Sequence, residues 1–344
     1  MRAHLRTVLV LVAAVGLLAW FLSQADLAHV WTEIQGVDPP LLGLAVAATL
    51  TTYVSRSIRW QALLEGLGPT HFGNAFRATV MGYAASFLLP ARPGEFLRPY
   101  VLARREALSA TAVFATVLLE RVFDMVTVLV LFALFLVLAD RSPGQSDPTA
   151  FRLVKLSGLL VAVVTVAVLA VLFVLAGRPG TLNGVVARVE RALPPRLGRR
   201  VAHVARTFTE GLAVVRRPQQ LVMVFAWSFP LWLSIAAGIW LVTRAFHIEM
   251  PFLGSFLVMT LLVAGVLFPT PGGIGSFHWM YRIGVVSFYH APVDRAVGAA
   301  IVLHAVSFFP VTAIGIVFMA QEGLTLGRMR RLAAEAGGAG EGAR

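Results

Sequence analysis

The sequence predicts an all-α fold, a polytopic bundle of membrane helices with an inverted pseudo-repeat. Of its 344 residues, 58% are hydrophobic and 13% are charged, and soluble domains carry roughly 25% charged residues. This composition excludes an ordinary soluble domain, and also a disordered chain, which would be poor in apolar residues. Long apolar stretches recur along the chain, and proline and glycine interrupt two of them at corresponding places. We expect about six full crossings plus two re-entrant, broken helix pairs, or about eight crossings if the broken pairs span.

Six apolar stretches approach or exceed the length of about 20 residues that a helix needs to cross the hydrocarbon core. They occupy residues 8–22, 41–64, 109–139, 153–176, 221–246 and 293–320. The first follows Arg2 and Arg6 and is short, so it also resembles a signal peptide cleaved near Ala25. We prefer a retained helix, because a multispanning chain usually keeps its first helix as an anchor.

Two further apolar stretches, residues 72–102 and 252–289, are interrupted by clusters of proline and glycine. Proline removes a backbone donor and clashes with the preceding turn, and glycine adds conformational freedom, so each stretch should be a broken helix. Irregular backbone at membrane depth is tolerated inside protein or beside a water-filled cavity, so both breaks should lie in the interior of the bundle. The expected hinge or backbone-amide positions are Pro90, Pro93, Gly94, Pro269, Pro271, Gly272, Gly273 and Gly275.

The two halves of the chain repeat one arrangement. Residues 40–139 and residues 220–320 each contain a span, a broken helix and a long span, and the break follows the start of each unit at nearly the same distance. Units of this kind in opposite orientation are typical of secondary transporters, whose binding sites lie at broken helices near the membrane midplane. The alternative is that any apolar chain shows spans at similar spacing.

Arginine placement predicts the orientation of the chain. The loop of residues 178–217 contains nine arginines against two glutamates, so it should be cytoplasmic by the positive-inside rule. The loop after the first span carries Asp26, Glu33 and Asp38 without a basic residue, and should lie outside. Both termini then lie in the cytoplasm. We expect the protein to be a multi-pass protein of the plasma (inner) membrane. We expect one transmembrane domain in residues 1–325 and a disordered cytoplasmic tail in residues 326–344.

The net charge of +12 does not indicate a nucleic-acid partner. The arginines lie between apolar stretches, which is the pattern of basic cytoplasmic loops beside anionic inner-leaflet lipids. The chain has no cysteine, which excludes disulfides, thiolate metal sites and cysteine nucleophiles.

Three charged residues, Arg92, Glu95 and Arg98, surround the first break. If the chain resumes as a helix at Gly94, its first amides and its dipole attract anions, and the planar guanidinium groups suit phosphate oxygens. Glu95 would pair with one arginine or receive a cationic headgroup. The alternative is an interfacial loop whose arginines bind leaflet phosphates without specificity. Arg56 and Arg59, at the end of the second span, are secondary candidates.

The third span contains Glu120, Arg121 and Asp124 within apolar sequence. Glu120 and Asp124 share a helix face, and Arg121 can meet Asp124 or reach the first break. Charges in an apolar membrane helix are costly unless they face the interior and are paired. The group therefore either binds substrate or forms a structural ion pair that locks this span to its neighbour.

The second break offers backbone amides or a hinge, and the alternative is that its glycines serve helix packing; His278 and His304 lie in or near the second unit. A lone intramembrane histidine is more often a packing residue than a proton carrier. No cluster of His and Glu has metal-ligand spacing, and the sequence has neither a phosphate-binding glycine-lysine loop nor a nucleophile elbow. The sequence therefore predicts that the protein binds no metal or cofactor and is not an enzyme.

Four motifs, in order, resemble the lysylphosphatidylglycerol synthase transmembrane-region family, whose members are described as flippase-like. Residues 90–98 are similar to its Pro-x-Arg-x-Gly-Glu-x-x-Arg stretch, residues 120–124 to its Glu-Arg-x-x-Asp motif, and residues 269–275 to its Pro-x-Pro-Gly-Gly-x-Gly motif. The pair Arg59-Trp60 also matches, and the resemblance covers roughly residues 5–320. One departure is Ser276-Phe277-His278, where the family often has an acidic residue. The resemblance implies an integral membrane protein of the lipid-translocating kind.

Together these features predict a flippase-like transporter that moves an anionic phospholipid or a lipid-linked headgroup between leaflets. The membrane phospholipid is its substrate, its phosphate binds near a broken helix, and the two breaks gate alternately. The alternatives are a membrane-embedded subunit or domain of a lipid-modifying transferase, in which Glu120 or Asp124 acts as a base, and a scaffold that anchors a partner. The sequence favours transport over transfer, because it contains no nucleophile, metal or nucleotide motif.

Overall fold

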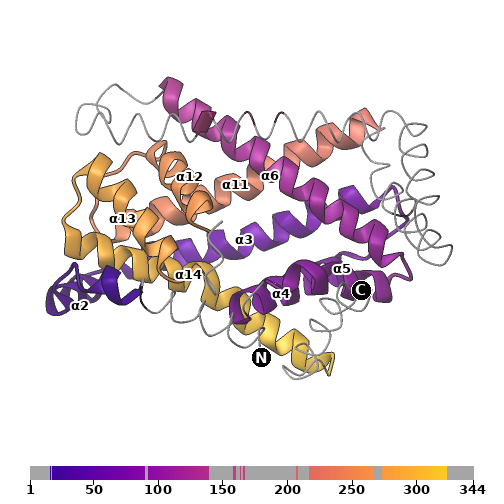
Figure 1. The fold of residues 1–344 in the computed structure, drawn as a ribbon, viewed down its shortest axis with the longest axis horizontal. Helices are drawn as coiled ribbons and strands as arrows, with labels where there is room; N and C mark the ends of the chain where they lie inside the picture. The colour runs from indigo at the N-terminus through magenta and orange to yellow at the C-terminus, as the bar shows by residue number, and fades with distance from the viewer. Residues whose placement is uncertain are drawn as a thin grey trace, which may run out of the picture.

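The computed structural model describes residues 18–89, 92–138, 217–266 and 273–323, with residues 16, 158, 159, 163, 166 and 207 besides. Within these ranges the chain is helical and contains no strand (Figure 1). Four helices are long and apolar enough to cross a membrane: α3 (Pro39–Leu64), α6 (Ala110–Leu138), α11 (Pro218–Ala245) and α14 (Val293–Gln321). They confirm four of the six predicted spans and the prediction of a polytopic helical membrane protein. The spans expected at residues 8–22 and 153–176 lie largely outside the described residues.

Local sequence explains where the long helices begin. Asp38 caps α3, because its carboxylate accepts a hydrogen bond from the backbone of Leu41 at 3.4 Å and Pro39 occupies the first helical position. This cap starts α3 two residues before the predicted apolar stretch. Pro292 precedes α14, and Asp294 lies in its first turn, where a carboxylate complements the helix dipole.

The first broken segment consists of α4 (Phe72–Leu88) and α5 (Gly94–Arg105). Its two ends lie together, because the backbone nitrogen of His71, which precedes α4, donates to Glu106, which follows α5, at 3.0 Å. The 17 residues of α4 span about 25 Å, less than the hydrocarbon core of about 30 Å. The pair therefore enters and leaves at the same end of the bundle.

The second broken segment consists of α12 (Gly254–Val266) and α13 (Ser276–Tyr289) and has the same form. The first residue of α12 touches the last residue of α13 so closely that a Cβ on Gly254 would lie 2.3 Å from the hydroxyl of Tyr289. This geometry favours the arrangement with re-entrant pairs over one with about eight crossings.

The two halves are related by an inverted pseudo-symmetry in the way their helices pack. Helix α3 corresponds to α11, α4 to α12, α5 to α13 and α6 to α14. Contacts follow this exchange, since α4 packs against α14 as α12 packs against α6, and α3 packs directly against α11. In Figure 1, α3 and α14 run from left to right, whereas α11 and α6 run from right to left. Each unit therefore inserts its re-entrant pair beside the long last helix of the other.

A short helix, α2 (Leu27–Gln35), covers one end of the bundle and packs against α14. The backbone nitrogen of Asp26 donates to Asp294 at 3.0 Å, and the guanidinium of Arg295 donates to Glu33 at 2.8 Å. At the other end of α14, Glu322 accepts a hydrogen bond from Arg105 at the end of α5. Helix α14 thus connects α2 at one end of the molecule to the base of the first re-entrant pair at the other.

Candidate functional site

A network of buried ion pairs joins α3, α5 and α6, and hydrogen bonds connect it to α11. Its two carboxylates, Glu120 and Asp124, come from successive turns of α6 and face the interior, as the spacing of four residues requires. Three arginines surround them. Arg56 and Arg59 come from α3, Arg98 comes from α5, and all five side chains are buried.

Glu120 lies at the centre of this network and has no exposed surface. One carboxylate oxygen accepts from Arg98 at 2.7 Å, and the other accepts from Arg59 at 2.9 Å and from Arg56 at 3.4 Å. The guanidinium of Arg98 also lies over the ring of Trp60, 3.8 Å from its centroid. The carboxylate therefore fastens α3 and α5 to α6 at one point.

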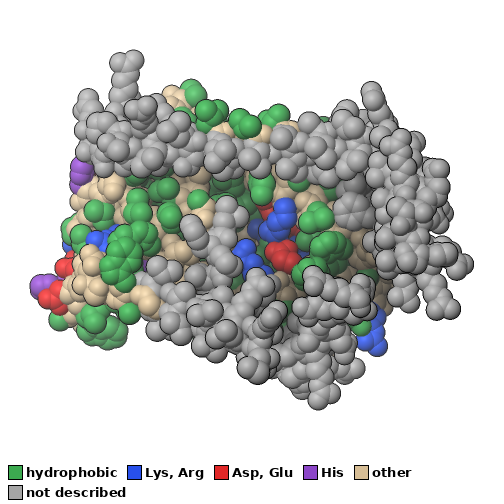
Figure 2. Space-filling view, in the orientation of Figure 1, with side chains coloured by type: hydrophobic (Ala, Val, Ile, Leu, Met, Phe, Trp, Pro, Cys, Tyr) green, Lys and Arg blue, Asp and Glu red, His purple; other side chains and the backbone are tan. Residues whose placement is uncertain are grey.

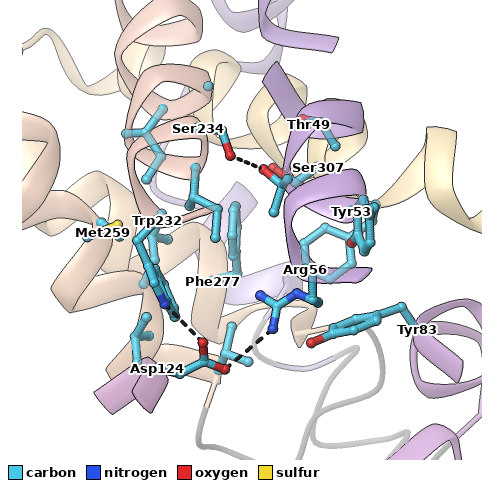
Figure 3. Close-up of a pocket in the computed structure, with 18 of the residues that line it drawn as sticks. Thr49, Tyr53, Arg56, Tyr83, Asp124, Trp232, Ser234, Met259, Phe277 and Ser307 are labelled. Atoms are coloured by element: carbon cyan, nitrogen blue, oxygen red, sulfur yellow. Dashed lines mark hydrogen bonds and ion pairs between the residues drawn. The ribbon is translucent and has the colours of Figure 1, made fainter. Parts of the chain in front are cut away.

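Asp124 connects the same arginines to α11. Its carboxylate binds Arg59 at 2.8 Å and Arg56 at 3.4 Å, and it accepts a hydrogen bond from the indole nitrogen of Trp232 at 3.0 Å. Figure 3 shows Arg56 and Trp232 converging on this side chain from two helices. Arg59 also donates to the hydroxyl of Ser228 on α11 at 2.9 Å. Helices α3 and α11, which come from opposite halves, thus both bind the carboxylate of Asp124.

A second, more accessible ion pair lies beside the network. Arg121 of α6 lies 3.2 Å from the carboxylate of Glu95 in the first turn of α5, and both side chains are about one-third exposed. Arg121 also binds Asp124 at 3.5 Å and the hydroxyl of Tyr83 at 3.2 Å. Arg121 therefore reaches both Asp124 and the first break.

Arg92 brings the two breaks into contact. It adopts a φ of +51°, a left-handed conformation that is uncommon for residues other than glycine. Its guanidinium donates a hydrogen bond to the backbone carbonyl of Val266, the last residue of α12. A cation at the C-terminus of a helix interacts favourably with the helix dipole. The first break is thus tied to the end of the broken helix in the other half.

A cavity of about 340 Å³ lies between the two halves, next to these charges. Its charged end is formed by Arg56, Arg92, Glu95, Arg121 and Asp124. Its remaining walls are mainly apolar and come from both halves, including Val128, Ile239, Met259, Leu262, Val263 and Phe277. Figure 3 shows Met259 and Phe277 on the apolar side and Arg56, Tyr83 and Asp124 on the charged side. The cavity is therefore amphipathic.

Hydroxyl groups occupy the apolar part of the cavity wall. The hydroxyls of Thr52 and Ser234 lie 2.7 Å apart and link α3 to α11. Thr49 and Ser307 also line the cavity. These groups can offer hydrogen bonds to esters or hydroxyls of a ligand beyond its charged group.

The charged residues around the cavity carry an excess of positive charge. Five guanidiniums stand against three carboxylates among the described residues of the network and the cavity wall, so two positive charges lack a carboxylate. Several guanidinium nitrogens of Arg56, Arg59, Arg98 and Arg121 are buried without a hydrogen-bond partner. In Figure 2, Lys or Arg and Asp or Glu side chains gather in the middle of one face, beside apolar side chains. An anion would complete this site electrostatically.

The structure brings six of the predicted site residues together, but only four of them line the cavity. Arg92, Glu95, Arg121 and Asp124 line the cavity, and Arg98 and Glu120 lie behind its wall. Of the secondary candidates, Arg56 lines the cavity and Arg59 lies behind the wall with Glu120.

The expected hinge residues are described in part. Pro93, Gly94, Gly273 and Gly275 belong to the described residues, whereas Pro90, Pro269, Pro271 and Gly272 lie outside them. Gly273 and Gly275 have φ values of +71° and +88°, a region that residues with a side chain rarely adopt. Gly273 and Gly275 therefore stand at two positions where the backbone conformation favours glycine.

Sequence reasoning did not identify the aromatic and hydroxyl partners of the charges. Tyr83, Trp232 and Ser228 each bind a charged group of the network. In a chain in which 10% of residues are aromatic, such residues look like ordinary membrane-helix packing. Among the aromatic partners of the charges, the sequence marked only Trp60, because it belongs to the Arg59-Trp60 pair.

A protein-family model matches most of this chain. The model described as "Lysylphosphatidylglycerol synthase TM region" matches residues 7–315 of this chain. This range includes both re-entrant pairs and the whole network of ion pairs.

Curated relatives come from archaea. A "UPF0104 membrane protein" of Methanothermobacter thermautotrophicus is 26% identical over 334 residues, which cover 91% of this chain and 94% of that protein. Another protein of that description, from Methanocaldococcus jannaschii, is 22% identical and covers the same shares. "Glycosyltransferase AglD" of Haloferax volcanii is 25% identical over 82% of this chain, but the match spans 49% of the length of that protein.

Proposed function

The chain belongs to the lysylphosphatidylglycerol synthase TM region family, and on this premise we propose that it moves an anionic phospholipid or a lipid-linked headgroup between membrane leaflets. The broader conclusion, a multi-pass membrane protein of lipid or glycolipid metabolism, has support from the family and from the relative named as a glycosyltransferase. The observation that carries the transport proposal is the cavity between the re-entrant pairs, which is cationic at one end and apolar along its remaining walls.

The charged end of the cavity suits a phosphate group. Arg56, Arg92 and Arg121 present guanidiniums to it, and a guanidinium can donate two parallel hydrogen bonds to phosphate oxygens. Uncompensated charge at membrane depth is costly, so an anionic headgroup would be stabilised by the two positive charges that lack a carboxylate. Arg59 and Arg98 are positioning residues in this proposal, because they hold Glu120 behind the wall.

The apolar walls of the cavity suit the part of a lipid that follows its headgroup. Methionine, leucine, isoleucine, valine and phenylalanine side chains from both halves line it. Thr52 and Ser234 also line the cavity, and their hydroxyls can form hydrogen bonds with ester or glycerol oxygens. A ligand with both a charged group and an apolar chain therefore matches the cavity better than a free ion does.

In this proposal the two breaks allow the alternating access that transport requires. In transporters with inverted repeats, alternating access arises when one repeat moves against the other around a central site. Arg92 joins the breaks through the carbonyl of Val266. A headgroup phosphate that binds Arg92 would replace this carbonyl as its partner and release one break from the other.

The proposal is tested with the full chain in vesicles that contain fluorescent phosphatidylglycerol, with fluorescent phosphatidylcholine as the probe without net charge. Transfer is followed by quenching the label in the outer leaflet. We expect faster transfer of phosphatidylglycerol, and a loss of about tenfold or more in Arg56→Ala and Arg92→Ala, since a hydrogen bond to a charged group contributes about 1.5–3 kcal/mol. Arg92→Lys should restore part of the rate, because an ammonium lacks the planar fork.

The matched control is Arg244→Ala, which removes an exposed arginine from the last turn of α11. Its transfer rate should equal that of the wild-type protein. Equal rates in the wild type, Arg56→Ala and Arg92→Ala would exclude the phosphate role of the cavity.

A second candidate function rests on the match to "Glycosyltransferase AglD", which spans about half of that protein. The chain would then serve as the membrane part of a system that modifies a lipid, and the cavity would present the lipid to a partner. Mass spectrometry of vesicle lipids separates the two cases. A lipid with an altered headgroup after incubation with a partner enzyme, and no movement between leaflets without it, would favour this candidate.

A further inference from the structure

The arginines at the charged end of the cavity hold hydrogen-bond donors that the protein does not use. Arg56 donates through Nη1 to Glu120 and Asp124, both at 3.4 Å. Arg92 donates through Nη2 to the backbone carbonyl of Val266. Among the described residues, Nη2 of Arg56 and Nη1 of Arg92 have no hydrogen-bond partner, although both side chains line the cavity. A ligand in the cavity can therefore accept from both.

A third guanidinium reaches the same end of the cavity from another helix. Arg121 of α6 lies 3.2 Å from the carboxylate of Glu95 and donates to the hydroxyl of Tyr83 at 3.2 Å. Arg56 comes from α3 and Arg92 precedes α5, so three separate segments present one guanidinium each. An anionic group with three acceptor oxygens can bind all three.

The charge around the cavity also defines the anion that fits it. Five guanidiniums stand against three carboxylates among the described residues of the network and the cavity wall, an excess of two positive charges. The parts of the two breaks outside the described residues, 90–91 and 267–272, contain no charged residue in the sequence. Uncompensated charge inside a membrane is costly. A ligand with two negative charges therefore balances the site, whereas a ligand with one leaves a cation without a partner.

The remaining wall offers little to a headgroup that carries a sugar or a polyol. Recognition of several hydroxyls requires side chains that both donate and accept, such as asparagine and glutamine, and the described lining contains neither. Its polar groups beyond the charged end are the hydroxyls of Thr49, Thr52, Tyr53, Ser234 and Ser307. The volume of about 340 Å³ is at the lower end of the range of about 300–1,000 Å³ for ligand sites. Both features favour a headgroup that ends at its phosphate.

The two histidines that the sequence marked lie outside this site. His304 of α14 stacks on Phe308 at 4.3 Å between ring centroids and packs edge-on against Phe277 at 5.3 Å. These two phenylalanines line the cavity, and His278 of α13 stacks on His304 at 4.8 Å. Both histidines therefore support the apolar wall and are not among its lining residues.

We propose that the cavity binds a lipid whose headgroup is a terminal phosphate, that is, a phosphate monoester on an apolar chain. The assignment rests on the transport function proposed above, and narrows the substrate of the same site from anionic lipids in general to this class. A phosphate monoester has three acceptor oxygens and carries about 1.5–2 negative charges at neutral pH. A diester such as phosphatidylglycerol has two terminal oxygens and a single charge. The monoester alone matches both the three guanidiniums and the excess of positive charge.

The first test measures equilibrium binding by the full chain in detergent and needs no lipid transfer. The probes are phosphatidic acid, phosphatidylglycerol and phosphatidylcholine with identical short acyl chains. We expect phosphatidic acid to bind about tenfold or more tightly than phosphatidylglycerol, because it makes a further charge-assisted hydrogen bond and balances the second positive charge. Phosphatidylcholine, which has no net charge, should bind least tightly. Equal affinities for phosphatidic acid and phosphatidylglycerol would overturn the assignment.

The ion pair between Arg121 and Glu95 allows the excess charge to be varied. Both side chains are about one-third exposed, so water can compensate for a lost partner. Arg121→Gln lowers the excess to one and should abolish the preference for phosphatidic acid. Arg121→Gln/Glu95→Gln restores the excess to two, so its preference should be several-fold greater than that of Arg121→Gln.

The matched control is Arg104→Gln, which removes an exposed arginine of α5 outside the cavity lining. It should keep the wild-type preference, and melting temperatures in detergent check that each variant is folded. A full preference in Arg121→Gln, or equal preferences in Arg121→Gln and the double variant, would show that excess charge does not select the ligand.

Two further probes identify the chain that carries the phosphate. Phosphatidic acid and an isoprenoid phosphate such as farnesyl phosphate share the terminal phosphate and differ in their apolar part, so the tighter of the two identifies the lipid type. Glycerol phosphate has the same phosphate without an apolar chain and should bind at least tenfold more weakly than either lipid, because it does not use the apolar wall. Equal binding of glycerol phosphate would overturn the assignment of a lipid.

The outcomes separate this assignment from the transport function. A preference for phosphatidic acid that follows the excess charge, together with no transfer of any lipid in vesicles, would support the monoester site and exclude transport. Arginine-dependent transfer of phosphatidylglycerol, together with equal affinities for the monoester and the diester, would leave transport intact and exclude the monoester site.

Discussion

At the scale of single residues, the chemistry of this protein depends on how buried charges are paired. An ion that loses its partner inside a protein costs far more than an ion pair gains. Glu120 pairs with three arginines and has no exposed surface, whereas Glu33 pairs with Arg295 at 2.8 Å near the surface. Removing the glutamate should therefore destabilise the protein far more at the buried position than at the partly exposed one.

Replacing Glu120 by Gln should destabilise the protein by about 3–5 kcal/mol, because three guanidiniums would lose the carboxylate that they share. The control Glu33→Gln should cost less than about 1 kcal/mol, since a partly exposed pair is screened by solvent. Thermal unfolding in detergent compares the two variants with the wild type. Similar losses in both would contradict the central role of Glu120.

At the scale of helices, the re-entrant pairs depend on close contact between their arms and on contacts at their base. Gly82 of α4 and Gly94 of α5 touch, and a Cβ on Gly94 would lie 1.7 Å from the carbonyl oxygen of Gly82. At the base, Glu106 accepts hydrogen bonds from the backbone of His71 and from the amide of Asn74, at 3.0 Å and 2.8 Å. These contacts keep the first break at the depth of the cavity.

Gly94→Ala should separate α5 from α4, because backbone atoms cannot move aside as a flexible side chain can. We expect a loss of about 1–3 kcal/mol or failure to fold, together with loss of lipid transfer. Gly43→Ala is the matched control, since a Cβ there would meet nothing within 4 Å. It should be neutral or stabilising by about 0.5–1 kcal/mol within helix α3. Equal melting temperatures of the two variants would refute the close contact.

The base of the first re-entrant pair should respond to acid. Burial by itself would raise the pKa of Glu106, but hydrogen bonds from His71 and Asn74 outweigh it and lower the pKa below the ordinary value of 4.5. Because the folded-state pKa is lowered, the stabilisation is present above the ordinary value and is lost as the pH falls through the folded-state pKa. Melting temperatures of the wild type and Glu106→Gln should therefore differ at neutral pH and converge in acid. The control Glu249→Gln removes an exposed carboxylate and should leave the melting temperature at neutral pH within error of the wild-type value.

At the scale of the whole molecule, two units of opposite orientation create one cavity. Neither unit encloses it alone, because α3, α6 and the segment from Arg92 into α5 supply the charges, whereas α11, α12, α13 and α14 supply most of the apolar wall. The ends of the bundle are distinct, since α2 binds the start of α14 and the base of the first re-entrant pair binds its end. The chain therefore has two chemically different sides.

We propose that α2 faces the outside and that the base of the first re-entrant pair faces the cytoplasm, as the arginine distribution predicts. The cysteine-free chain permits a direct test with His29→Cys, whose native side chain is 72% exposed, and Arg104→Cys at an exposed position of α5. An impermeant maleimide should label the first variant in intact cells and the second only after the membrane is opened. The reverse pattern would invert the orientation and with it the entry side of the first break.

The sequence by itself determined the class of the protein and the positions of its breaks. Apolar stretches of sufficient length can satisfy their backbone only as helices in a membrane, and a close cluster of prolines and glycines interrupts a helix. For these reasons four spans and both re-entrant pairs followed from composition and order. Arg92, Glu95, Arg121 and Asp124 could be selected because charge in apolar sequence is conspicuous.

Only the tertiary structure decided which charges line the cavity and which lie behind it. Arg98 and Arg92 are equivalent in the sequence, but Arg98 is enclosed by Glu120 and Trp60 whereas Arg92 crosses to Val266 of the other half. The stacking of His278 on His304 likewise joins two helices. Such contacts depend on the packing of segments far apart in the chain, and local pattern carries no information about the distance between them.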